Sequence, residues 1–162
     1  MKIQFEYLAK LDEQMVDKLS DFESDHFKWS WSKKVWKELA SSSRNIVCLW
    51  QESLENNKKE IISLCVFELS SPDFCHLYKI VVDEKFRRRK LALALFKQMC
   101  HVASVELGFS KPHIYLEVEE NNDGAIGFYQ KMGLKQIHIK KRFYQNGNSA
   151  VIMQGVQDCD KP

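Results

Sequence analysis

Five cations lie within six residues of one another, at Lys85 and at positions 87–90. They separate an apolar run that predicts a strand from an apolar-periodic run that predicts a helix. The first turn of a helix has unpaired N–H groups and the positive end of the helix dipole, so it binds anions. Cations at that point oppose the dipole unless an anion neutralises both. The cluster therefore indicates either a phosphate-binding loop or a solvated basic turn.

Two glutamates on one expected strand could exchange a proton with a substrate. In the sequence IYLEVE, Glu117 and Glu119 share one face with Tyr115, and the apolar residues share the other. A carboxylate on the open face of a strand is solvated by default. Alternation by itself therefore leaves Glu117 and Glu119 as equal candidates for a general base.

Tyr129 and Asn122 belong to the next expected helix, over residues 123–132. Tyr129 lies in an apolar stripe with Phe128 and Met132, which is typical of a core tyrosine whose hydroxyl has a partner. Asn122 directly precedes the helix, where an asparagine side chain caps the first turn. Local sequence by itself assigns neither residue to chemistry.

The patterning predicts the elements that hold these residues. Alternation and apolar runs indicate a mixed α/β (α+β) fold, in which a mostly antiparallel sheet carries helices on its faces. The Asn146-Gly147 dipeptide predicts the turn of the last hairpin. We expect one domain over residues 1–156, a frayed tail over 157–162, about four helices (11–22, 32–39, 91–107 and 123–132) and seven strands (3–7, 45–51, 60–69, 76–83, 114–118, 134–144 and 149–156).

Composition restricts the class of protein. A chain of 162 residues, 44% hydrophobic and 28% charged, is typical of a soluble globular domain, and a net charge of +2 argues against nucleic-acid binding. No apolar run is long enough for a membrane helix, and the first ten residues lack the apolar core of a signal peptide. Five cysteines without a CxxC pair and five scattered histidines argue against disulfides and a metal site. We expect a reduced, cytoplasmic protein without a metal.

Two segments resemble the GNAT superfamily of acyl-CoA-dependent N-acetyltransferases. The strand end IVV and the run RRRKLA, residues 80–82 and 87–92, resemble the strand and pyrophosphate loop of that family. The segment NDGAIGFYQKMGL, from Asn122 to Leu134, resembles a second family pattern that follows in the same order. The family loop carries glycines where this sequence has Lys90 and, commonly, where it has Arg88.

The resemblance implies a GNAT-like fold and direct transfer of an acetyl group from acetyl-CoA to an amine. It implies that Glu117 is the base, acting through water, and that Tyr129 serves the departing CoA thiolate. Because a tyrosine pKa of ~10 exceeds a thiol pKa of ~8.5, Tyr129 could act as the thiolate develops or as a hydrogen-bond donor. The implied acetyl-CoA-binding residues are Ile80, Val81, Val82, Arg87, Arg88, Arg89, Lys90, Leu91, Ala92, Leu93 and Asn122, with backbone N–H groups of Ile80 to Val82 polarising the thioester carbonyl.

Three further segments resemble the RimI-like ribosomal-protein alanine N-acetyltransferases: ESDHFKWSWS, LEVEENN and KKRFYQNGNSAVIM. They imply that Glu23, Trp31 and Tyr144 contact the acceptor, and that the acceptor is a protein N-terminal amine. Ser30 and Ser149 replace a proline and an aspartate that are usual there, so a small-molecule amine stays an alternative acceptor. The missing loop glycines keep a third alternative open, a non-catalytic CoA-binding or interaction module.

Overall fold

The computed structural model describes residues 2–8, 10–42, 44–52, 59–70, 73–106, 108 and 111–158. Its strands form one sheet in the order β1-β2-β3-β4-β5-β7-β6, in which only the β4–β5 pair is parallel. The expected mixed, mostly antiparallel α/β fold with four α-helices is therefore confirmed. The strands are β1 (Lys2–Leu8), β2 (Arg44–Glu52), β3 (Lys59–Ser70), β4 (Phe74–Val82), β5 (His113–Glu119), β6 (Lys135–Lys140) and β7 (Ala150–Val156). The helices are α1 (Glu13–His26), α2 (Lys33–Ala40), α3 (Leu91–His101) and α4 (Asp123–Lys131).

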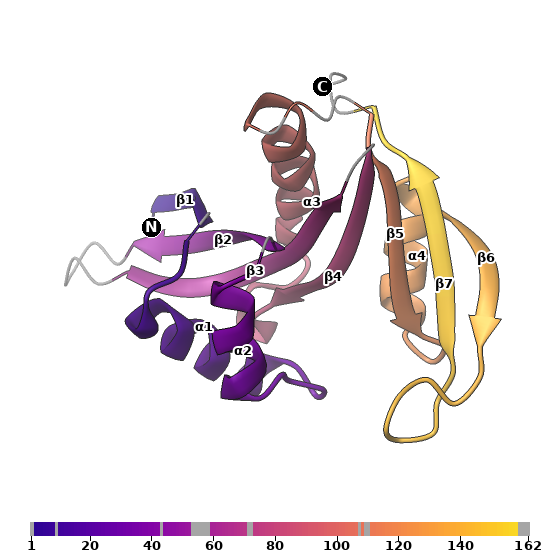
Figure 1. The fold of residues 1–162 in the computed structure, drawn as a ribbon, viewed down its shortest axis with the longest axis horizontal. Helices are drawn as coiled ribbons and strands as arrows, with labels where there is room; N and C mark the ends of the chain where they lie inside the picture. Colours follow the sequence, from indigo (N-terminus) through magenta and orange to yellow (C-terminus); the bar gives the residue numbers. More distant parts are fainter. Residues whose placement is uncertain are drawn as a thin grey trace.

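Helices cover both faces of the sheet (Figure 1). Helices α1 and α2 pack on one face, over a core that includes Leu19, Trp36 and Val81. Helices α3 and α4 pack on the other face, over a core that includes Leu95 and Tyr129. The apolar stripes of these helices match the apolar sides of the strands, which is why the elements expected from periodicity assemble in two layers of helix around one sheet.

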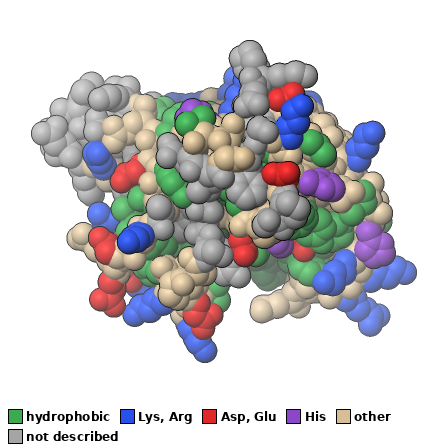
Figure 2. All heavy atoms as spheres, turned by 45° about the horizontal axis from the view of Figure 1, so that its top comes forward, with side chains coloured by type: hydrophobic (Ala, Val, Ile, Leu, Met, Phe, Trp, Pro, Cys, Tyr) green, Lys and Arg blue, Asp and Glu red, His purple; other side chains and the backbone are tan. Residues whose placement is uncertain are grey.

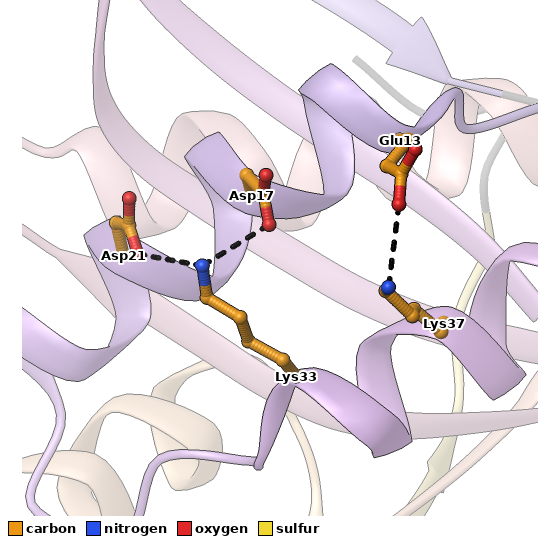
Figure 3. A network of polar contacts seen from close by, with 5 residues as sticks. All are labelled: Glu13, Asp17, Asp21, Lys33 and Lys37. Atoms are coloured by element: carbon orange, nitrogen blue, oxygen red, sulfur yellow. Dashed lines mark hydrogen bonds and ion pairs between the residues drawn. The ribbon is translucent and has the colours of Figure 1, made fainter.

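Helices α1 and α2 are also joined by exposed ion pairs (Figure 3). Lys33 lies 3.1 Å from Asp17 and Lys37 lies 3.3 Å from Glu13, atom to atom. Exposed pairs of this kind contribute little to stability, because water screens them. The buried Trp36, which has no exposed surface, anchors α2 far more strongly.

The C-terminal strand pair differs from the expectation. The predicted strand over 134–144 is wrong in its last four residues, because β6 ends at Lys140 and residues 141–149 form a loop. Arg142 has a left-handed φ of 52°, which ends the extended backbone. The turn expected at Asn146-Gly147 is present within this loop, where Gly147 has a φ of 86° and donates its N–H to the Tyr144 carbonyl. The predicted strand is too long because the strand-like pattern of the sequence continues beyond Lys140, where the strand ends.

Two other boundaries depend on contacts that sequence periodicity does not show. The helix expected over 11–22 continues to His26, and the helix expected over 91–107 changes to a π-helical turn at Val102–Glu106. The expected domain over 1–156 and tail over 157–162 stay predictions. Gln157 is hydrogen-bonded to Pro112 and Met132, whereas 159–162 lie outside the described residues.

Strand β6 is the exposed edge of the sheet. All of its residues are exposed, and Ile137 and Ile139 are 50% and 44% accessible. Figure 2 shows hydrophobic side chains beside Lys and Arg side chains at the right, where β6 and β7 lie in Figure 1. Lysines on an edge strand oppose pairing with another chain, so β6 fits the common form of a protected edge. None of the helices in the described part of the chain combines the length and apolar character required to cross a bilayer.

Candidate active site

Strands β4 and β5 separate after three residue pairs and leave one side of β4 open. Their parallel pairing spans only Phe74–His76 of β4. On the other side, Asp83, just past β4, donates its N–H to a β3 carbonyl at 2.9 Å. Because backbone groups alternate between the two sides of a strand, the N–H groups of Ile80 and Val82 face the opening. The N–H of Val81 faces β3, so this amide is not available to a ligand in the opening.

Tyr78 is an extra residue in β4. The pairing of β3 with β4 passes from Leu77 to Lys79 and leaves Tyr78 without a partner residue. Such a bulge shifts the alternation of side chains by one position. Leu77 packs in the core under α3, whereas Tyr78 and Lys79 both face α1 and α2. The bulge thereby places His76, Tyr78 and Lys79 on the same face of the sheet.

His76 and Glu117 form a hydrogen-bonded pair across the β4–β5 seam. The His76 Nε2 and Glu117 Oε2 atoms are 2.7 Å apart, and the side chains are only 24% and 19% accessible. Burial raises the pKa of the Glu117 carboxyl. The hydrogen bond and charge of His76, together with the Tyr115 hydrogen bond and the Lys140 charge, outweigh burial, so the pKa lies below its usual value. The Tyr78 ring stacks on His76 with centroids 4.1 Å apart, and Tyr115 completes the group by hydrogen bonding to Glu117. This pair can accept a proton and pass it on.

Glu119 has different partners. Its Oε1 accepts hydrogen bonds from the side-chain amides of Asn146 and Asn148, both at 2.6 Å. These hydrogen bonds lower the pKa of Glu119, with smaller contributions from Trp29 and Lys28. Glu119 is therefore held by amide donors, which cannot take up a proton from it.

Tyr129 is buried on the opposite face of the sheet, in the core under α3 and α4. Burial raises the pKa of its hydroxyl well above the usual range, and the nearby Cys65 and Tyr144 raise it further. Tyr144 is half-buried, and burial together with the charges of Glu117 and Glu119 raises its pKa to about 12. Glu117 and Tyr129 thus share Tyr144 as a neighbour while projecting from opposite faces. Both tyrosines stay protonated at neutral pH.

The loop before α3 adopts the conformation that glycine favours, although it contains no glycine. Arg88 and Lys90 have φ angles of 61° and 62°, in the left-handed region. These are the two positions at which the sequence departs from the glycines of the family loop. Arg87 is held by Glu84 at 3.2 Å and donates to the Val82 carbonyl. The side chains of Arg88 and Lys90 have no ion pair or hydrogen bond among the described residues.

A pocket of about 420 Å³ lies between this loop and α4. On one side it is lined by Arg88, Lys90 and the first turn of α3, whose N–H groups have no partner within the helix. On the other side it is lined by Phe128, Lys131 and Met132 of α4. Unpaired amides, cations on both walls and an apolar floor suit a ligand that carries phosphate on an organic chain. Its full lining is Val82, Phe86, Arg87, Arg88, Lys90, Leu91, Ala92, Leu93, Phe128, Lys131 and Met132.

Four of the expected cofactor residues do not line this pocket. Ile80 packs against the core under α3 and α4. Asn122 caps α4, since its Oδ1 accepts the N–H of Ala125 at 3.1 Å. Val81 packs in the core under α1 and α2. Arg89 lies against the Phe86 ring, with its guanidinium carbon 5.2 Å from the ring centroid.

Glu23 is fully buried, which differs from the expectation that it contacts the acceptor. Its carboxylate accepts the indole N–H of Trp36 at 2.7 Å and is bonded to the Lys79 ammonium. Burial lowers the pKa of Lys79 to about 8, against the opposing effect of Glu23. A buried carboxylate needs such partners, and with both oxygens occupied Glu23 cannot reach an acceptor directly. It supports the surrounding residues instead.

Trp31 and Tyr144, the other two residues expected to contact the acceptor, lie on one face of the sheet. Trp31 is half-buried and lies over the Lys79 ammonium, whose Nζ is 3.5 Å from the indole centroid, and its ring contacts Tyr78 edge-on. Tyr144 is half-buried beside Glu117. These aromatic residues come from the α1–α2 connection and the β6–β7 loop, and both lie on the face of the sheet that carries Glu117.

Sequence reasoning missed His76 and the α4 wall of the pocket, Phe128, Lys131 and Met132. The expected strands over 76–83 and 114–118 belong to one βαβ unit, so their first residues were bound to be neighbours. That adjacency could have paired His76 with the face that carries Glu117. Lys131 gave no signal, because a lysine on a short helix is ordinarily solvated.

The comparisons with known proteins agree with this arrangement. The model of the acetyltransferase (GNAT) family matches residues 12–134. The matched region contains the opening between β4 and β5 and the basic loop beside it. The chain belongs to the acetyltransferase (GNAT) family.

Similar curated proteins include the N-alpha-acetyltransferase of Saccharolobus solfataricus, which is 32% identical over 78 residues. That match covers 48% of this chain and 46% of the relative, so the chain spans about half the length of the curated relatives it matches. The probable N-acetyltransferase san of Drosophila melanogaster is 32% identical over 60 residues, covering 37% of this chain and 32% of the relative.

Solved structures of similar fold include the ribosomal-protein-S18-alanine N-acetyltransferase of Escherichia coli. It matches with a TM-score of 0.78 at 20% identity and covers 96% of this chain and 94% of that one. Arabidopsis thaliana NAA60 in complex with acetyl-CoA matches with a TM-score of 0.79 at 16% identity, covering 96% and 98%. At these identities the likeness establishes the fold.

Proposed function

We propose that this protein is an acetyl-CoA-dependent N-acetyltransferase whose acceptor is a protein N-terminal amine. The observation that carries the proposal is the His76–Glu117 pair, 2.7 Å across the seam where β4 leaves β5, next to unpaired β4 amides. A proton acceptor beside a row of free N–H groups suits attack by an amine on a carbonyl. The cytoplasm is part of the proposal, because an odd set of five cysteines without a CxxC pair is typical of a reduced protein.

The reaction divides into three tasks. Glu117 accepts a proton from the acceptor ammonium, through water, and His76 carries charge away from it. The free amine attacks the thioester carbonyl carbon, whose oxygen is polarised by the N–H groups of Ile80 and Val82. The acceptor nitrogen loses its second proton to solvent as the amide forms, the C–S bond breaks, and the CoA thiolate leaves. Tyr129 donates a hydrogen bond to that sulfur, since its raised pKa makes full transfer of its proton to a thiolate uphill.

Acetyl-CoA binding is supported by the loop and by the pocket beside it. Arg88 and Lys90 supply the left-handed backbone that glycines give in the family, so the amides at the start of α3 stay open to phosphate. Lys131 adds a cation from the opposite wall. The retained loop conformation weakens the case for a non-catalytic module, which depended on the absence of those glycines.

The arrangement of the residues expected to contact the acceptor favours a peptide N-terminus over a small amine. Tyr144 lies beside Glu117. Trp31 contacts Tyr78, which stacks on His76, the partner of Glu117. Two aromatic residues from separate segments suit an extended chain better than a closed cavity does. Similar proteins carry the name N-alpha-acetyltransferase, which agrees with this choice. The substitutions at Ser30 and Ser149 keep small amines in the test.

The test is an acceptor screen with detection of released CoA thiol. Peptides with different first residues and a set of small amines are compared at equal concentration, with acetyl-CoA in excess. We expect kcat/KM to be at least tenfold higher for some peptides than for any small amine. A higher kcat/KM for a small amine would show that the acceptor is a small molecule and not a protein N-terminus. If acetyl-CoA binds in calorimetry but no acceptor releases thiol, the non-catalytic module is favoured.

A further inference from the structure

We propose that Glu119 is a positioning residue that ties together the two segments flanking Glu117: the α1–α2 connection and the β6–β7 loop. The inference rests on the proposed function and deepens it. By alternation along β5, Glu119 is equivalent to Glu117 and could equally be the base. The contacts of the two carboxylates separate their roles.

On one side, Glu119 organises the β6–β7 loop. Its Oε1 accepts from the side-chain amides of Asn146 and Asn148, each at 2.6 Å. Asn148 in turn accepts the N–H of Tyr144 on its carbonyl oxygen at 3.1 Å. Two charge-assisted hydrogen bonds therefore hold the turn from which Tyr144 extends toward Glu117.

On the other side, Glu119 lies beside the α1–α2 connection. The indole Nε1 of Trp29 is buried without a completed hydrogen bond. Glu119 is near enough for Trp29 and Lys28 to lower its pKa further. A buried N–H of this kind costs free energy until it finds an acceptor, and Glu119 is the carboxylate beside it. Two segments more than a hundred residues apart thus meet at one side chain.

The same contacts argue against Glu119 as the base. A general base must lose its proton again after each turnover. Glu117 can pass the proton to His76, with which it is already hydrogen-bonded. The partners of Glu119 are amide N–H groups, which can only donate. Glu119 therefore positions the acceptor indirectly, by holding Tyr144 and the α1–α2 connection in place.

Steady-state kinetics between pH 6 and 9 test this role. For Glu119→Ala we expect acceptor KM to rise about tenfold, kcat to change less than threefold, and the acetyl-CoA KM and the pH profile of kcat to stay unchanged. Glu119→Gln, which keeps an acceptor oxygen at the same place, should recover part of the loss. Glu38→Gln, an exposed carboxylate on α2, serves as the matched control. A shifted pH profile or a kcat loss without a KM rise in Glu119→Ala overturns the proposal.

The partner amides give a second arm. Asn146→Ala with Asn148→Ala should raise acceptor KM to the same extent, and adding Glu119→Ala should raise it no further, because the residues act as one unit. If the increases in acceptor KM multiply in the triple variant, the residues have independent roles and the proposal is overturned.

Hydrogen exchange separates this inference from the proposed function. In Glu119→Ala, the amides of residues 141–149 should exchange at least tenfold faster than in the wild type, without a change in the α3 amides. This holds whether or not any acceptor is acetylated. An enzyme without acceptor activity but with this faster exchange would refute the function and keep Glu119 as the organiser of the loop. Unchanged exchange rates would refute the positioning role of Glu119, whether or not the protein acetylates an acceptor.

Discussion

Replacing Lys90 by glycine should make the protein more stable while weakening its hold on acetyl-CoA. Lys90 ends the loop before α3 with a φ of 62°, a conformation that costs an L-residue about 1–2 kcal/mol. Glycine adopts it freely but gains about 0.5–1 kcal/mol of freedom in the unfolded chain. The net gain in the free energy of unfolding should be about 0.5–1 kcal/mol. For a chain of this length that corresponds to a rise in Tm of about 1–4 °C.

Lys90→Ala is the matched control. Alanine also removes the cation from the positive end of α3, so the helix-dipole effect is the same in both variants. It keeps a Cβ, however, and so keeps the strain of the left-handed backbone. The Tm of Lys90→Gly should therefore be higher than the Tm of Lys90→Ala.

Affinity should move in the opposite direction. Both variants lose an exposed cation of the pocket, worth about 0.4–1 kcal/mol, which raises the Kd for acetyl-CoA by about two- to fivefold. Calorimetric melting and isothermal titration with acetyl-CoA measure the two effects separately. Equal melting temperatures for Lys90→Gly and Lys90→Ala would show that Lys90 is not held in the left-handed region and would refute the reasoning.

Four further outcomes are expected. Tyr129→Phe should retain the fold but lower kcat by about 10²–10⁴, and a loss under threefold would remove the hydroxyl from the mechanism. Glu117→Gln should lose most activity near neutral pH and recover partly at high pH. In His76→Ala, burial raises the pKa of Glu117 against only the Tyr115 hydrogen bond and the Lys140 charge, so the acid limb of kcat/KM should move to higher pH. Because the pKa of Lys79 is lowered to about 8 in the folded state, the free energy of unfolding should rise from pH 8 to 10. Lys79→Met with Glu23→Gln should flatten that rise in denaturant titrations; an unchanged slope would contradict it.

Local features of the chain were predictable from the sequence. Ser32 caps α2 by accepting the Val35 N–H, and Gly133, with a φ of 84°, follows the end of α4. Both depend on residue types within a few positions of each other. The alternation of β5 also put Glu117 on the open face, because strand periodicity needs no knowledge of the partner strand.

Contacts between distant segments were not predictable in the same way. The bulge at Tyr78 changes which residues of β4 face α1, and no residue type in that strand announces it. Glu23 carries a charge and was expected at a surface, yet it is buried because Lys79, from 56 positions away, neutralises it. Glu119 could be separated from Glu117 only once the loop of Asn146 was seen to fold back onto it.

The short seam between β4 and β5 has a consequence for how the molecule opens. Among the described residues, only three residue pairs join the backbone of the first four strands to that of β5, β7 and β6. Sub-global opening of the C-terminal strands should therefore cost less free energy than complete unfolding. A cofactor lying between the β4 edge and α4 would bridge both parts and, at a hundred times its Kd, would add about 2.7 kcal/mol to the cost of that opening. The acceptor site would then be held in its closed arrangement only after acetyl-CoA has bound. We therefore expect acetyl-CoA to bind first and the acceptor second.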